Sequence, residues 1–234
     1  MATENIYFDK EENLETSRGV NLPHWHQNNK AYFITFRLDD SLPMSRAAEL
    51  TGIKRSFEQH NPKPWDAATR LKYHKLIGRV EECLLDAGYG ECCLRNDRCR
   101  RIVADAINRL NRDVYDIVAY VIMPNHIHLL TVISERGNAQ EMMRLIKGIS
   151  SREINGFINR SGKLWHADYF DRIVRSEDHF KHCLNYIVNN PKNLREGEYS
   201  LYVKGMDNLW SKGFSPCTQR LGMQGFQPLQ LKPR

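Results

Sequence analysis

Two histidines stand two residues apart in the stretch "MPNHIHLLTVI", where His126 and His128 flank Ile127 at the start of an apolar run. Residues two apart in a β-strand point to the same face, so both imidazoles would project side by side, together with Leu130 and Val132. Two neutral imidazoles in this arrangement can chelate one divalent ion through their ring nitrogens. A pair of hydrogen-bonded structural histidines fits the same spacing, so the spacing alone leaves both interpretations open.

A second histidine pair, His24 and His26 in "LPHWHQNN", has the same spacing. It lies among Pro, Gln and Asn just before the first expected strand, where nothing fixes both side chains on one face. A ligand pair on a rigid central strand is better preorganised than one on a loop. The context therefore favours His126 and His128 as the candidate metal-binding pair.

A helix is predicted for "SEDHFKHCLNYIVNN", with Ser176 as its cap. Its apolar stripe at helical spacing consists of Phe180, Cys183, Leu184, Ile187 and Val188. Tyr186 and Asn190, four residues apart, share one shoulder of this stripe, whereas Asn189 points nearly opposite. His182 lies one turn before Tyr186. The helix thus presents a hydroxyl and an amide at the margin of the core, although an ordinary half-buried tyrosine and a helix-ending asparagine would look the same.

The elements that must position these residues follow from hydrophobic periodicity and breakers. In chain order we expect a strand at 31–38, a helical insertion at 43–86, a helix at 96–111, two strands within 115–133, a helix at 138–160, a short strand at 169–174 and the helix that begins at Ser176. Without the insertion, the first part has the β-α-β-β-α order of a ferredoxin-like domain. The sequence therefore predicts an α+β fold: a ferredoxin-like antiparallel sheet with helices on one face, plus a helical insertion after the first strand.

Composition sets the domain limits and the class of partner. We expect a flexible arm over residues 1–21, the folded domain over 22–195, and a C-terminal extension with a flexible tail over 196–234. The 34 Lys and Arg against 28 Asp and Glu give a net charge of +6, which suits a nucleic acid and equally an ordinary basic protein.

The six cysteines form no CxxC pair, and no apolar run approaches the roughly 18 residues of a membrane-spanning helix. These features predict a reduced, cytoplasmic protein that does not interact with membranes.

Several separated motifs point to one family. They are "HWH" followed by "YFITFRLDDSLP", then "GYGECCLRNDRC", "YVIMPNHIHLL", "KGISSREIN" and "LWHADYFDRIVRSEDHFKHCLNYIVNNP". With these motifs in this order, the chain resembles the REP-associated tyrosine transposases, which are IS200-like, single-tyrosine members of the HUH endonuclease superfamily. The resemblance covers roughly residues 22–195, and it is specific because it rests on several motifs and not on one.

The resemblance implies a catalytic HUH domain in which His126 and His128 bind Mg²⁺ or Mn²⁺, with Asn190 as third protein ligand. Tyr186 would be the nucleophile that cuts single-stranded DNA and remains attached to the 5′ phosphate while a 3′ hydroxyl leaves. The reverse attack would rejoin the strand. The resemblance also implies that the DNA partner contains short REP-like palindromes folded as hairpins next to the cleavage site.

Some assignments stay open at this point. Tyr169 is a rival nucleophile, although "YFD" looks like a strand edge whose Arg172 and Arg175 would contact DNA phosphate. His182 is a hypothetical proton acceptor for Tyr186, and a solvated surface histidine is the alternative.

Three functions compete. The first is a DNA-cleaving and strand-transferring transposase, the second a catalytically silent regulator that binds hairpin DNA or RNA, and the third a metal-dependent hydrolytic nuclease in which Tyr186 is structural. A covalent protein–DNA adduct separates the first from the other two. The oligomeric state, monomer or homodimer, is left open by the sequence.

Overall fold

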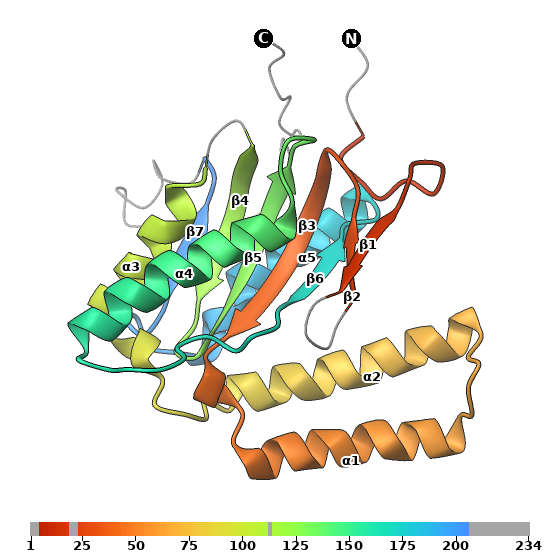
Figure 1. Ribbon diagram of the computed structural model, residues 1–234, viewed down its shortest axis with the longest axis horizontal. Helices are drawn as coiled ribbons and strands as arrows, with labels where there is room; N and C mark the ends of the chain where they lie inside the picture. Colours follow the sequence, from red (N-terminus) through yellow and green to blue (C-terminus); the bar gives the residue numbers. More distant parts are fainter. Residues whose placement is uncertain (1–4, 19–22, 112–113, 206–234) are drawn as a thin grey trace.

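The computed structural model of the protein describes residues 5–18, 23–111 and 114–205. A five-stranded antiparallel sheet in the order β6-β3-β5-β4-β7 forms its centre (Figure 1). Its strands are β3 (Lys30–Arg37), β4 (Tyr115–Ile122), β5 (His126–Ile133), β6 (Phe170–Ile173) and β7 (Ser200–Val203). The predicted α+β class and antiparallel sheet are confirmed.

Strands β4 and β5 form the hairpin that the two β-rich runs around Met-Pro-Asn predict. The turn is closed by a hydrogen bond from the Met123 amide to the His126 carbonyl, 2.9 Å long. All eight residues of β5 are buried. A strand that is buried on both faces needs cover on both sides of the sheet.

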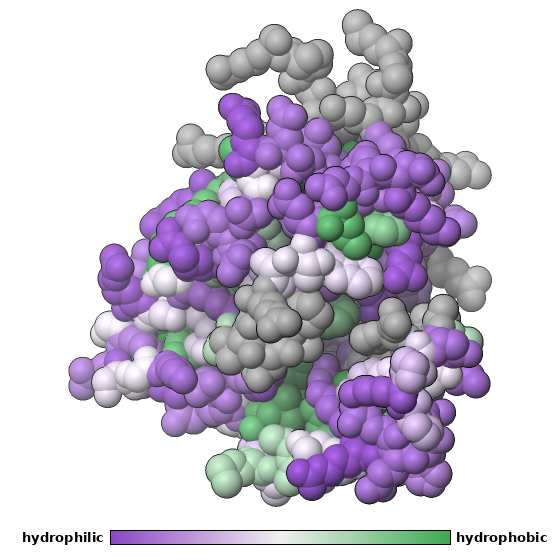
Figure 2. All heavy atoms as spheres, turned by 45° about the vertical axis from the view of Figure 1, so that its right-hand side comes forward, coloured by the Kyte–Doolittle hydropathy of each residue, from purple (hydrophilic) through white to green (hydrophobic). Residues whose placement is uncertain are grey.

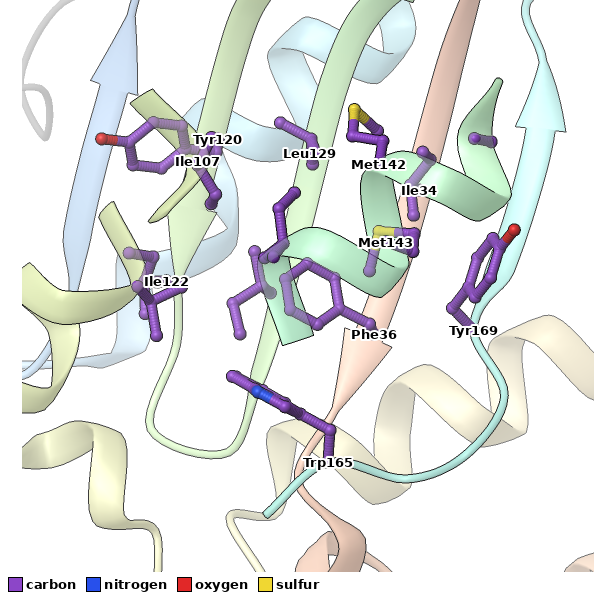
Figure 3. Packing of buried hydrophobic residues seen from close by; sticks show 14 of the residues in the cluster. Ile34, Phe36, Ile107, Tyr120, Ile122, Leu129, Met142, Met143, Trp165 and Tyr169 are labelled. Carbon is purple, nitrogen blue, oxygen red and sulfur yellow. The ribbon is translucent and has the colours of Figure 1, made fainter. Parts of the chain in front are cut away.

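Helices α3 (Asp97–Asn108) and α4 (Ala139–Phe157) cover one face, as predicted. Each has an asparagine cap: the Asn96 side chain accepts from the Arg98 amide at 2.9 Å, and the Asn138 side chain accepts from the Glu141 amide at 2.7 Å. Side chains of α4 pack on those of the sheet around Trp165 (Figure 3). The labelled members of this core are Ile34, Phe36, Ile107, Tyr120, Ile122, Leu129, Met142, Met143, Trp165 and Tyr169.

Helix α5 (Glu177–Asn189) lies on the opposite face of the sheet (Figure 1). Its buried residues are Phe180, Cys183, Leu184 and Ile187, which belong to one apolar cluster with Val121, Leu130 and Val132 of the sheet. The expectation of helices on one face therefore holds for α3 and α4 and is corrected for α5. The physical reason is that β4 and β5 are apolar on both sides, and the stripe of α5 buries the second side.

The predicted insertion is a helical hairpin of α1 (Met44–His60) and α2 (Ala67–Asp86), preceded by a short 3-10 turn at Asp39–Ser41. An aromatic cluster joins the two helices: the Trp65 ring lies 5.5 Å from that of Phe57 and 4.7 Å from that of Tyr73. The hairpin projects from the end of β3, and the C-terminal end of α2 returns to the sheet (Figure 1).

Residues 5–18 differ from the predicted flexible arm, because they pack against the domain. Ile6 is buried, and its carbonyl accepts a 2.7 Å hydrogen bond from the Ala31 amide. Strand β1 (Glu15–Arg18) pairs with β2 (Pro23–His26) in a separate two-stranded sheet. Ile6 and the partly buried Tyr7, Phe8 and Leu14, together with a pair of short strands, hold a segment that shows no periodicity.

The C-terminal extension supplies edge strand β7, which pairs with β4. The predicted flexible tail from residue 206 onward lies outside the described residues. The described helices include none whose length and hydropathy would allow it to cross a membrane. On the side drawn in Figure 2 the surface is mostly hydrophilic, with apolar residues gathered in a few places.

Candidate functional site

His126 and His128 lie side by side on β5, on the face that α5 covers. Both are almost fully buried, with 1% and 2% of their surface exposed. Their ring centroids are 4.8 Å apart and their planes are nearly perpendicular. The strand alternation read from the sequence thus places both imidazoles together.

The Nδ1 atom of each ring has a fixed partner. His126 Nδ1 is 2.8 Å from Asn125 Oδ1, and His128 Nδ1 is 2.8 Å from Thr35 Oγ1. Because the Asn125 oxygen can only accept, His126 carries its proton on Nδ1 and leaves Nε2 with a free lone pair. Partners of this kind set the tautomer and ring orientation of metal-binding histidines.

Burial lowers the pKa of His126 to about 3. Burial, followed by the neighbouring His126, lowers the pKa of His128 well below its usual range. Both rings are therefore neutral at neutral pH, which is the protonation state that a metal ligand requires.

Tyr186, on α5, faces this pair. Its hydroxyl is 3.5 Å from His128 Nε2, and the two rings meet edge to face at 5.0 Å. Phe33 stacks on His128 at 5.6 Å and meets Tyr186 edge-on at 5.8 Å, so it packs both rings into place. Burial raises the pKa of Tyr186 well above its usual range, and the carboxylates of Glu82 and Asp86 raise it further. The phenol is therefore neutral and needs activation to act as a nucleophile.

Asn190 follows α5 and begins the 3-10 turn Asn190–Asn193. Its side chain hydrogen-bonds Tyr186. This contact lowers the pKa of the phenol and so opposes a small part of the rise caused by burial and the two carboxylates. Its amide oxygen is buried and has no hydrogen-bond partner among the described residues. Asn189, the alternative, is exposed and donates to the Asn185 carbonyl at 2.7 Å. Asn190, and not Asn189, therefore lies beside Tyr186, and its role as a ligand stays a prediction.

These side chains fit a hard divalent ion. Two neutral imidazole nitrogens and one unpartnered amide oxygen are available, and Mg²⁺ or Mn²⁺ commonly completes such a shell with phosphate oxygens and water. The described part of the chain contains no group of three or more His, Cys, Asp or Glu residues placed to hold a metal. An ion at this site would therefore depend on the mixed set of His126, His128 and Asn190.

Two carboxylates at the site come from the insertion, and the sequence reasoning missed them. Glu82 of α2 hydrogen-bonds Tyr186, and Asp86, one turn later, has its Oδ1 atom 4.0 Å from His126 Nε2. Burial raises the pKa of both carboxyl groups. Their i, i+4 spacing is visible in the sequence, but nothing in it indicates which way the insertion folds.

Asn125 ties the insertion to the histidines. Its side-chain amide donates to the Leu85 carbonyl at 3.2 Å and the Tyr89 carbonyl at 3.1 Å, while its oxygen faces His126. One buried side chain thus fixes both the end of α2 and the orientation of His126.

The predicted DNA-contacting arginines flank the site at the sheet edge. Arg172 on β6 is exposed and pairs across the sheet with Phe33. Burial, followed by the charges of Arg172 and Arg175, lowers the pKa of His179, so positive charge gathers here. His182 is exposed on α5, and within the described residues no hydrogen bond joins it to Tyr186.

Tyr169, the rival nucleophile, and His24, from the rival histidine pair, lie together away from this site. Tyr169 is buried on the α4 side of the sheet and stacks on His24 at 4.2 Å. His24 Nδ1 is 2.7 Å from Asp171 Oδ1. Tyr169 and His24 therefore contact each other, and His128 and Tyr186 lie on the other face.

The family model described as "Transposase IS200 like" matches residues 93–190. This range includes both site histidines, Tyr186 and Asn190. The match covers somewhat less than half of the chain.

Two solved structures are similar to this protein. One, a REP-associated tyrosine transposase bound to a REP hairpin, is 14% identical, with 74% of this chain and 73% of that chain covered and a TM-score of 0.41. The other, a putative transposase from Deinococcus radiodurans R1, is 16% identical, with 70% of this chain and 92% of that chain covered and a TM-score of 0.32. No curated protein sequence gives a significant match.

Proposed function

We propose that this IS200-like protein is a metal-dependent transposase that cleaves and rejoins single-stranded DNA next to hairpins through a 5′-phosphotyrosine. The observation that carries the proposal is the 3.5 Å approach of the Tyr186 hydroxyl to His128 Nε2, beside a second imidazole and the unpartnered Asn190 oxygen. A nucleophile next to a candidate metal-binding set is the arrangement that phosphoryl transfer needs. The family of residues 93–190 supports the same reaction class.

His126, His128 and Asn190 would hold Mg²⁺ or Mn²⁺, which when bound would polarise a phosphate oxygen and neutralise charge on the phosphoryl group. The chain itself aligns the nucleophile. Phe33 and the α5 stripe hold Tyr186 on the histidine face, so its oxygen approaches phosphorus from a fixed direction.

Tyr186 would attack the scissile phosphorus. A bond forms between the Tyr186 oxygen and phosphorus, the bond to the 3′ oxygen breaks, and that oxygen leaves as a 3′ hydroxyl after taking a proton. The 5′ phosphate stays on the tyrosine, which conserves the bond for rejoining by a 3′ hydroxyl.

The tyrosine proton has two candidate acceptors in the chain. Glu82 hydrogen-bonds Tyr186 and is the better placed. His182, one turn before Tyr186 on α5, remains the alternative. Either group would act as a general base. It would raise the nucleophilicity of a phenol whose pKa is too high for spontaneous ionisation.

The DNA would lie across the basic edge of the sheet, with Arg172 and Arg175 on its phosphates. The net charge of +6 is consistent with this partner. Tyr186 and both histidines come from the same chain, so a monomer would already contain the proposed site, and a homodimer is not required for it. We assign the catalytic domain to residues 22–195 and expect the protein in the cytoplasm, associated with the nucleoid when DNA is bound.

The test is to incubate the protein with end-labelled single-stranded hairpin oligonucleotides, including repeats that flank its own gene, and Mn²⁺ or Mg²⁺. We expect an adduct that survives denaturing electrophoresis and disappears in Tyr186→Phe and with a chelator. The control is Tyr169→Phe, which removes a buried hydroxyl without a hydrogen-bond partner among the described residues and should leave the adduct intact.

Other outcomes would select the competing functions. Cleavage that survives Tyr186→Phe without an adduct would indicate a hydrolytic nuclease. Tight hairpin binding with no cleavage under any of these conditions would indicate a regulator.

A further inference from the structure

Phe170 is an exposed aromatic residue on the same sheet face as the candidate site. It pairs with Thr35 across β6 and β3, and Thr35 pairs with His128 across β3 and β5. Directly opposed residues of antiparallel strands point to the same face, so Phe170, Thr35 and His128 form one row. Two strand spacings of about 4.8 Å put the backbone of Phe170 about 10 Å from that of His128, a distance that a few nucleotides span.

The ring of Phe170 is accessible, since 36% of the residue is exposed. Helix α5 packs on β4 and β5, which lie at the His128 end of the row. Phe170 is at the opposite end, on edge strand β6, and stays at the surface. The described residues include only five exposed large apolar side chains, and Phe170 is the one that shares a row with a site histidine.

A positive charge lies against the ring. The Arg172 guanidinium carbon is 5.3 Å from the ring centroid, and Arg172 shares the face of Phe170 two residues along β6. Arg175 lies just beyond the strand. Burial lowers the pKa of Arg172, and the nearby carboxylate of Glu82 on α2 opposes part of this shift. An exposed ring beside arginines is the combination that binds single strands, in which bases stack on the ring and phosphates contact the cations.

We propose that Phe170 stacks with an unpaired base of the DNA strand next to the scissile phosphate, while Arg172 contacts the phosphate of the same nucleotide or its neighbour. The inference rests on the proposed function and adds a residue that selects single strands. In a duplex the bases are already stacked and paired, so they are not available to the ring. Phe170 would thereby help to position the strand over Tyr186.

The chain offers a matched control. Phe157 on α4 is 39% exposed and has the Arg98 guanidinium 4.3 Å from its ring centroid, so its environment is similar to that of Phe170. It lies on a helix that covers the opposite face of the sheet, away from the histidines.

The experiment measures binding of a fluorescent hairpin with a single-stranded tail of about ten nucleotides, a length within the usual site range, over a series of salt concentrations. Tyr186→Phe serves as the background, so that cleavage does not interfere. We expect Phe170→Ala to weaken binding about 5- to 100-fold, the loss of one stacked base, with the slope of log K against log salt unchanged. Arg172→Gln should instead reduce that slope by about 0.7, the loss of one phosphate contact on a single strand. Phe157→Ala should bind like the parent.

Two further variants keep the result interpretable. Phe170→Trp should retain affinity because it keeps an aromatic face, whereas Phe170→Leu, which keeps apolar volume without a π face, should lose it. Affinity within twofold of the parent for Phe170→Ala, or an equal loss in Phe157→Ala, overturns the inference while the proposed function stands. If the parent itself shows no salt-dependent binding to the hairpin with its tail, the proposed function fails, and the inference fails with it.

Discussion

Within the described residues, histidine, tyrosine and acidic side chains meet on both faces of the sheet. On the α4 face, His24 contacts Asp171 at 2.7 Å and stacks flat on Tyr169. On the α5 face, Tyr186 meets His128 edge-on, and its hydroxyl approaches Nε2 at 3.5 Å. The residue types are the same in both clusters, but the atoms that could react are engaged differently.

Nδ1 is engaged in both clusters, and the difference lies in which part of the tyrosine faces the imidazole. In the first cluster His24 Nδ1 is engaged by a carboxylate, and the tyrosine ring is covered by the imidazole on one side and by Lys147, whose Nζ is 5.4 Å from the centroid, on another. In the second cluster both Nδ1 atoms also have partners, and the Tyr186 hydroxyl lies 3.5 Å from His128 Nε2. Orientation of the partner groups, more than residue type, separates a packing cluster from a candidate site.

The largest expected contrast is between His128→Ala and His24→Ala. His128→Ala should abolish Mn²⁺ binding measured by calorimetry, because one of the two proposed imidazole ligands is lost. His24→Ala should keep Mn²⁺ binding but lower the free energy of unfolding by about 2–4 kcal/mol, because Asp171 then loses its buried partner. Loss of Mn²⁺ binding in His24→Ala but not in His128→Ala would reverse the assignment of the two clusters.

A second contrast concerns the proton acceptor. If Glu82 takes the proton of Tyr186, Glu82→Gln should slow adduct formation about 10²- to 10⁴-fold. The pKa of Glu82 is raised by burial, so its carboxylate form, and the activity that depends on it, should be lost as pH falls through this raised pKa. Rates measured against pH should therefore lose their acidic limb in Glu82→Gln.

His182→Ala is the companion variant for this test. Its rate should stay near that of the wild type at every pH, because the side chain is exposed on α5. A normal pH profile in Glu82→Gln combined with a slow His182→Ala enzyme would transfer the role to His182.

Local periodicity was enough to predict the two halves of the site. Strand alternation placed His126 and His128 on one face, and helical phase selected Asn190 over Asn189 beside Tyr186. That the two halves meet depends on α5 crossing the second face of the sheet, a contact between residues some 60 positions apart along the chain, and only the family resemblance implied it.

Other features depend on tertiary contacts that no local pattern encodes. Glu82 and Asp86 reach the site because Asn125 holds the end of α2 through two backbone carbonyls. Likewise, the burial of Ile6 against Ala31 turns a polar, aperiodic segment into a packed one. In each case contacts between segments far apart in the sequence decide where a whole segment lies, and such contacts carry no periodic signal.

The smallest contrast tests the orienting partner of His128. Thr35→Val keeps the shape of the side chain and removes the oxygen that lies 2.8 Å from His128 Nδ1. We expect Mn²⁺ affinity to fall about 10- to 100-fold, the usual effect of losing such a partner, while the Tyr186 adduct still forms at saturating Mn²⁺. Thr131→Val is the matched control, because Thr131 is a buried threonine of the same strand pair whose hydroxyl donates to the Asp116 carbonyl and not to a histidine. Equal Mn²⁺ affinity in the two variants would mean that packing by Phe33 alone orients His128, and that the hydrogen bond between Thr35 and Nδ1 does not prepare the site.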